Sequence, residues 1–171
     1  KDFSLADVAM GLNLQMLLYL FTLWQTRDDH FTEKLGCKQG DILPAGVLYF
    51  GAHLPLISSD IPMTTEEITA EATDSIQRKG LFIDDPDILR AMDKNLSGKY
   101  IPVRMKKDGG FYSGTPITSI AGFGEIMNQI TSIIERVSSE LKSGDASVKP
   151  LKTHTRDACQ YCRFKPVCRK I

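Results

Sequence analysis

The sequence predicts a mixed α/β fold with more helix than strand. In residues 119–142, apolar side chains recur at intervals of three and four, which is typical of a long amphipathic helix. Residues 45–52 form a short apolar run between Pro44 and Pro55, rich in β-branched and aromatic side chains, and this predicts a buried strand. The 171 residues are 42% apolar and 25% charged, which argues against a disordered, collagen-like or coiled-coil chain.

The first helices are predicted within residues 4–26. Residues 4–7 fit a helix start, and residues 12–26 form the helix proper. Apolar side chains fall on nearly every side of this second segment, so we expect it to be buried all round. Its apolar run is shorter than the roughly 20 residues of a bilayer crossing and polar residues interrupt it, so we expect no membrane span. Residues 28–43 are polar, contain two glycines and predict a loop.

The middle of the chain predicts two further helices and a short extended piece. A threonine at 64 or 65 followed by two glutamates marks a helix start, and we expect this helix to run to about Lys79, before Gly80. A brief extended segment follows Gly80, and then a short helix near Pro86 to Met92.

A hairpin and a helix end are predicted in the last third. Residues 99–105 and 111–113 flank the turn-rich sequence KKDGG, which predicts a β-hairpin. The long helix of residues 119–142 is expected to end at Gly144, because glycine commonly follows the last helical turn. Residues 146–150 then form an extended piece that leads into a cysteine-rich tail.

Charge is segregated along the chain. The 21 basic and 21 acidic residues give a formal net charge of zero, which at face value disfavours a dedicated nucleic-acid-binding protein. However, residues 149–171 hold seven basic residues against one acidic residue, and residues 1–148 carry a net charge of −6. We therefore expect two parts, residues 1–148 and a basic tail at 149–171. The tail either approaches phosphate groups or is simply a solvated cationic segment.

Three of the four cysteines lie in that tail as Cys159, Cys162 and Cys168. The C-x2-C pair brings two thiolates to one side of a tight turn and the third follows closely, which is a metal-ligand pattern. The basic residues of this segment favour ionised thiolates; they are Arg163, Lys165 and Arg169. The alternative to a metal site is that these cysteines are reduced surface residues or form one local disulfide. Four cysteines are too few for a disulfide scaffold in a chain of this size.

Two metal centres are compatible with these cysteines. Zinc would take His154 as the fourth ligand in H-x4-C-x2-C-x5-C, and spacing alone favours this reading. An iron–sulfur cluster needs four cysteines, so its fourth ligand would be Cys37 or a residue outside this chain. Cys37 lies in the predicted polar loop without partner spacing, and we expect it to have no ligand role.

Gln15 and Tyr19 are four residues apart on the predicted buried helix, so their side chains share one face. A buried glutamine must satisfy its hydrogen-bonding groups. One interpretation is a satisfied polar pair in the core. The other is a pair that orients a neighbouring catalytic group or holds a phosphate oxygen.

Five sequence stretches in one order carry a family resemblance. They are DFSL, GLNLQMLLYL, PAGVLYFGAHLPLI, KGLFIDD followed by AMD, and DACQYCRFKPVCR. Together they span residues 2–169 and resemble the RecB-like nucleases of the PD-(D/E)XK superfamily, in particular the C-terminal nuclease domain of AddAB-type ATP-dependent helicase–exonuclease B subunits. The resemblance implies an α/β, restriction-endonuclease-like domain, helix-rich, with a C-terminal iron–sulfur staple segment.

The resemblance also implies site roles. Gln15 and Tyr19 match the Q-x3-Y motif beside the active site, which helps to position the catalytic centre and DNA. The three tail cysteines match three of the four ligands of a 4Fe–4S cluster that fastens the end of the domain to an upstream point. With this cluster, His154 becomes a bystander. The tail residues Arg163, Lys165 and Arg169 would contact DNA without regard to sequence.

The activity implied is Mg²⁺-dependent hydrolysis of DNA at double-strand ends for recombinational repair, in a cytoplasmic heterodimer with an A subunit. The family's magnesium-binding carboxylates and catalytic lysine lie upstream of the position of Lys1. We therefore expect this chain to be the distal part of a nuclease domain, inactive alone and a poor holder of the cluster. The rival hypothesis is a non-enzymatic zinc module, with His154 as a ligand, that binds nucleic acid or protein.

Overall fold

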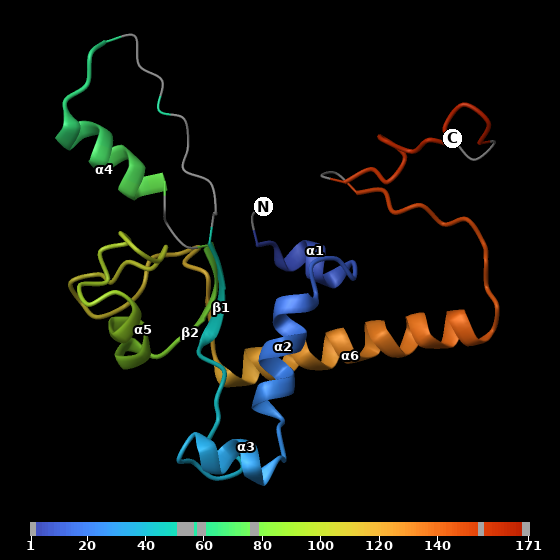
Figure 1. The fold of residues 1–171 in the computed structure, drawn as a ribbon, viewed down its shortest axis with the longest axis horizontal. Coiled ribbons are helices and arrows are strands. Elements are labelled where there is room, and N and C mark those ends of the chain that lie inside the picture. Colours follow the sequence, from blue (N-terminus) through green and yellow to red (C-terminus); the bar gives the residue numbers. More distant parts are fainter. Residues whose placement is uncertain (1–2, 51–56, 58–60, 76–78, 154–155, 169–171) are drawn as a thin grey trace. The chain divides into compact units, whose positions relative to one another are not determined.

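The computed structural model describes residues 3–50, 57, 61–75, 79–153 and 156–168. Six helices and three strands are assigned within these residues: α1 (Leu5–Ala9), α2 (Gln15–Trp24), α3 (Asp29–Lys34), β1 (Gly46–Tyr49), α4 (Thr65–Ser75), β2 (Lys79–Ile83), α5 (Pro86–Met92), β3 (Ile117–Thr118) and α6 (Ile120–Lys142). Figure 1 shows them along the chain. The chain divides into two compact units, Lys1–Ile133 and Ile134–Ile171.

A small mixed sheet with the order β1-β2-β3 organises the first unit. Strand β1 runs antiparallel to β2, with Val47 opposite Leu81, and β3 runs parallel to β2, with Ile117 opposite Phe82. Gly80 in β2 lies so close to β1 that a Cβ atom there would overlap the carbonyl oxygen of Val47. The central strand therefore requires glycine at this position.

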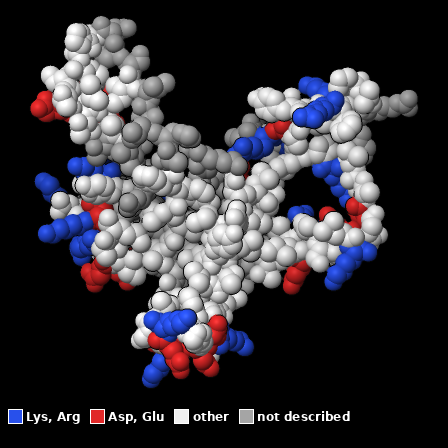
Figure 2. All heavy atoms as spheres, viewed as in Figure 1, with Lys and Arg blue, Asp and Glu red and all other residues white. Residues whose placement is uncertain are grey.

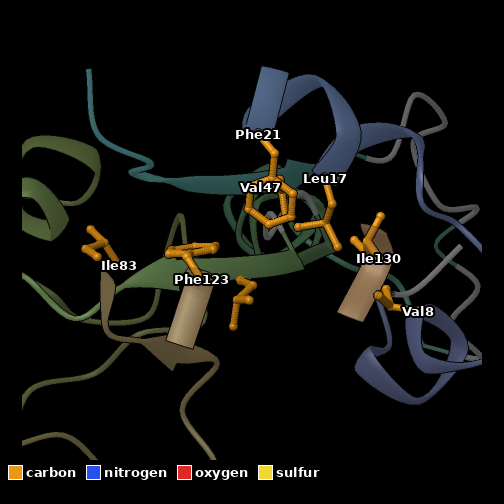
Figure 3. Close-up of a cluster of buried hydrophobic side chains, with 8 residues drawn as sticks. Val8, Leu17, Phe21, Val47, Ile83, Phe123 and Ile130 are labelled. Atoms are coloured by element: carbon orange, nitrogen blue, oxygen red, sulfur yellow. The ribbon is translucent and has the colours of Figure 1, made fainter. Parts of the chain in front are cut away.

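The larger core lies on one face of the sheet. Its buried residues are Val8, Leu17, Phe21, Val47, Leu81, Ile83, Phe123 and Ile130. Figure 3 shows the α2 side chains Leu17 and Phe21 meeting Val47 of β1, together with Phe123 and Ile130 from α6. This core therefore joins α1, α2 and the first turns of α6 to the sheet.

A second core uses the opposite face of β2. It consists of Phe82, Leu89, Leu96, Ile101 and Val103, all buried. Successive strand residues point to opposite faces, so Leu81 and Ile83 enter the first core while Phe82 enters the second. This division explains why β2 is almost continuously buried. The second core fastens α5 and the segment between α5 and β3 to the sheet.

The expected burial of the second helix on all sides is wrong. Helix α2 has only Leu17 and Phe21 fully buried, whereas Met16, Tyr19 and Leu23 are exposed by 38%, 57% and 47%. Only the face that carries Leu17 and Phe21, one turn apart, meets the sheet. An apolar composition does not reveal which faces of a helix have a neighbour.

Other differences concern short elements. The predicted loop at residues 28–43 contains α3, which begins after Asp28, whose carboxylate accepts the backbone amides of His30 and Phe31. The helix predicted from Thr64 or Thr65 is confirmed at its start, but Lys79 belongs to β2, so its predicted end is wrong.

The predicted hairpin contains one antiparallel bridge, Met105 to Phe111, in place of paired strands. Strand β3 was not predicted.

Helices α5 and α6 lie where the sequence places them, and a glycine with φ +70°, Gly144, follows α6. The strand predicted at residues 45–52 is confirmed over Gly46–Tyr49, but Ala45 and Phe50 lie outside β1, and residues 51–52 lie outside the described residues. Only Val47 of β1 is buried, so the expectation of a buried strand is confirmed in part. No helix in the described part of the chain is long and apolar enough to cross a bilayer.

Candidate functional site

Gln15 and Tyr19 form a hydrogen-bonded pair on the exposed face of α2. The Gln15 Nε2 group donates to Tyr19 Oη over 2.8 Å, and the Tyr19 side chain is 57% exposed. Among the described residues these two side chains bond only to each other. The interpretation of a satisfied pair inside the core is therefore wrong. Gln15 Oε1 can accept, and the Tyr19 hydroxyl can donate, a hydrogen bond to a further group.

The turn before α2 fixes the orientation of this pair. Gly11 and Asn13 both adopt left-handed conformations, with φ of 80° and 56°. The Asn13 side-chain amide donates to Asp7 Oδ2 over 3.2 Å, and Asp7 is only 7% exposed. With Leu17 buried on the opposite face of the helix, rotation of α2 is restricted. Asp7 and Asn13 match no site motif in the sequence, although a glycine followed closely by an asparagine is a turn signal.

Other apolar side chains on these two helices are also exposed. On α2 they include Met16 and Leu23, and α1 and its C-terminal end contribute Leu5 and Met10, which are 46% and 51% exposed. The described residues contain no group of three or more His, Cys, Asp or Glu side chains placed to bind a metal. The arrangement can therefore position a neighbouring group or a phosphate oxygen, but the described residues supply no metal-ligand set beside it.

The tail cysteines lie on successive turns and form no disulfide among the described residues. Cys159 and Cys168 are partly buried and Cys162 is exposed. The amide of Cys162 donates to the carbonyl of Cys159, and that of Cys168 donates to the carbonyl of Phe164. Three thiols fit the chemistry of a thiolate-bound metal or cluster. In this structure they are not gathered into a ligand group.

The remaining predicted site residues have simple positions. Cys37 donates its thiol to the Thr32 carbonyl over 3.6 Å, and the expectation that it has no ligand role stays a prediction. Arg163 and Lys165 are exposed, as expected for phosphate contacts or for a solvated tail. His154 and Arg169 lie outside the described residues.

Comparison with known protein families identifies the fold. The profile described as "PD-(D/E)XK nuclease superfamily" matches residues 1–169. This chain belongs to the PD-(D/E)XK nuclease superfamily. The expected restriction-endonuclease-like domain, with a small mixed sheet and helices, is confirmed.

Within the PD-(D/E)XK nucleases, the curated relatives that match this chain share one name. It is 35% identical over 169 residues to the ATP-dependent helicase/deoxyribonuclease B subunit of Desulforamulus reducens. It is 32% and 34% identical to the proteins of the same name from Acetivibrio thermocellus and Oceanobacillus iheyensis. Each match covers 98% of this chain but 14% of the relative. The chain therefore corresponds to about one seventh of the length of these relatives.

Proposed function

We propose that this chain is the distal part of the nuclease domain of an ATP-dependent helicase/deoxyribonuclease B subunit, and that the complete domain hydrolyses DNA with Mg²⁺. The observation that carries the proposal is the match, over 98% of the chain, to relatives with that name. The exposed Gln15–Tyr19 pair supports it, because the Q-x3-Y motif of such nucleases acts beside the active site.

Gln15 and Tyr19 act as positioning residues in this proposal. Because Gln15 Nε2 donates to the Tyr19 hydroxyl, the tyrosine proton is free to donate to a phosphate oxygen of the DNA backbone. Gln15 Oε1 is then free to accept a hydrogen bond from a donor of the catalytic centre. Bound Mg²⁺ would stabilise charge on the scissile phosphate. We assign none of the described residues to that ion, since they contain no suitable ligand group.

The tail cysteines are proposed to hold a 4Fe–4S cluster. Cys159, Cys162 and Cys168 supply three unpaired thiols, and the fourth ligand comes from elsewhere in the protein. The cluster would fasten the tail to the rest of the nuclease domain. The tail cations Arg163 and Lys165 are exposed and would contact the DNA backbone, together with Arg169.

At the level of the whole protein, we propose the processing of double-strand DNA ends for recombinational repair in the cytoplasm. The relatives are named as B subunits, which supports a heterodimer with an A subunit. ATP would bind to helicase parts of the protein that lie outside this chain.

The test of the nuclease function is DNA cleavage by the full-length protein with Mg²⁺, with and without EDTA. Gln15→Ala is expected to lower the cleavage rate about 10- to 100-fold, the usual effect of removing a group that orients catalytic residues. Gln129→Ala, an exposed glutamine on α6, is the matched control and should leave the rate unchanged. Full activity of the Gln15 variant would remove its assigned role.

The cluster is tested by metal analysis of the same protein. A brown protein that contains iron and acid-labile sulfide, both lost when Cys159, Cys162 and Cys168 are replaced by alanine, is the expected result. A colourless protein with stoichiometric zinc would instead support the zinc module.

A further inference from the structure

The segment between α5 and β3 carries a concentration of positive charge. Residues 94–116 contain five basic residues and one acidic residue, Asp108, whereas the rest of residues 1–148 contains nine basic and nineteen acidic residues. The basic residues are Lys94, Lys99, Arg104, Lys106 and Lys107, and all are exposed. Figure 2 shows blue side chains at the left edge of the molecule, where Figure 1 places this segment beside α5. We call residues 94–116 the basic loop.

The basic loop is anchored by its own buried residues, which belong to the second core. Ile101 and Val103 are completely buried and Leu96 is 3% exposed, while the cations at positions 99 and 104 point to solvent. The backbone amide of Tyr100 donates to the carboxylate of the buried Asp93. The charges therefore stand on a packed scaffold, which lowers the entropy lost when a ligand orders them.

Two exposed aromatic rings stand among these cations. Lys99 Nζ lies 5.5 Å from the centre of the Tyr100 ring, and Lys106 Nζ lies 5.5 Å from the centre of the Tyr112 ring. The two tyrosines are 51% and 55% exposed. Within the described residues, no carboxylate forms an ion pair with a cation of the basic loop. The ammonium groups of Lys99 and Lys106 are thus next to a ring and open to an anion.

Arg104 lies between the two lysine–tyrosine pairs in the sequence. Its side chain lies across Gly98, where a Cβ atom would be 2.8 Å from Arg104 Cγ, and Gly98 also has φ +80°. Arg104 then lines a pocket of about 530 Å³. The other residues that line this pocket are Pro102, Tyr112, Ser113, Gly114 and Thr115. Thr115 Oγ1 donates to the Tyr112 carbonyl over 2.6 Å and holds the pocket wall in place.

We propose that the basic loop binds single-stranded DNA, with bases stacked on Tyr100 and Tyr112 and phosphates held by Lys99, Arg104 and Lys106. Cations interleaved with exposed aromatic rings are typical of surfaces that bind single strands, because only unstacked bases can lie on the rings. The choice of DNA among polyanions rests on the proposed function. The loop would hold the strand in the nuclease domain while the active site cleaves it.

A photochemical cross-link tests the loop itself in the full-length protein. A short oligothymidylate that carries iodouracil is irradiated with the protein in EDTA, and cross-linked peptides are identified by mass spectrometry. We expect adducts on Tyr100 or Tyr112. Replacing Lys99, Arg104 and Lys106 with alanine should lower their yield about tenfold and weaken its dependence on salt. No adduct in residues 94–116, or an unchanged yield in this variant, would overturn the proposal.

The control variant replaces Arg27, Lys34 and Lys38 with alanine, which removes the same charge from exposed positions around α3 and should leave the yield unchanged. A competitor oligonucleotide without bases distinguishes stacking from simple anion binding. It should compete about tenfold less well than oligothymidylate, and equal competition would overturn the stacking role.

Cleavage assays on the same samples separate this proposal from the proposed function. Cross-linking at the basic loop in a protein that does not cleave DNA would refute the nuclease function and leave the loop as a DNA site. Cleavage without cross-linking would refute the loop alone.

Discussion

Helix α2 should be much more sensitive to change on its buried face than on its exposed face, and two leucines allow a matched comparison. Leu17 has no exposed surface and belongs to the first core, while Leu23 on the same helix is 47% exposed. Replacing a buried leucine with alanine costs about 2–5 kcal/mol, because it removes apolar contacts and leaves a cavity. The exposed substitution should cost about 0.5 kcal/mol.

Hydrogen exchange of the β1–β2 amides in the full-length protein measures this difference locally. The expected cost for Leu17→Ala corresponds to a loss of protection of about 30-fold to several-thousand-fold. Leu23→Ala should change protection by about twofold. Equal effects of the two substitutions, or full protection in the Leu17 variant, would refute the half-buried position of α2 and with it the exposed position of Gln15 and Tyr19.

Two further substitutions test other parts of the fold. Gly80→Ala should separate β1 from β2 and abolish soluble expression, because the alanine Cβ would overlap the Val47 carbonyl oxygen. A normal yield of soluble protein and unchanged amide exchange in β2 would contradict this close approach of the two strands. The pKa of Glu67 is lowered below its ordinary value of 4.5 by hydrogen bonds from the Thr64 backbone amide and hydroxyl. Its stabilisation of α4 should therefore be complete above that ordinary pKa and disappear as the pH falls through the lowered folded pKa. Amide exchange of α4, corrected for intrinsic rates, should show this loss in the parent and not in Glu67→Gln.

Elements with strong local signals could be predicted from the sequence. Helix α6 has a long apolar repeat, and α5 begins with Asp85 as N-cap and Pro86 in the first turn, so both were predicted almost to the residue. Strand β3 has two residues and exists only because Phe82 and Ile83 pair with it. Such a strand has no local pattern to detect.

The candidate site was only partly predictable for a related reason. The spacing of Gln15 and Tyr19 predicted a shared helix face, but their exposure depends on which side of α2 meets the sheet. The charges of the basic loop alternate with buried residues such as Ile101 and Val103, so the sequence suggested a hairpin and not a charged surface. In both cases the missing information was the position of a distant element.

The most direct test of the central claim is a double-mutant cycle on the DNA cleavage rate of the full-length protein, with Gln15→Ala, Tyr19→Phe and both together. Because the two side chains bond to each other over 2.8 Å, they should act as a unit. Each single substitution should lower cleavage about 10- to 100-fold, and the double variant should be no slower than the slower single one, with ATP hydrolysis unchanged. Cleavage at the parent rate, or a double effect equal to the product of the single effects, would contradict a joint role of Gln15 and Tyr19 at a nuclease site.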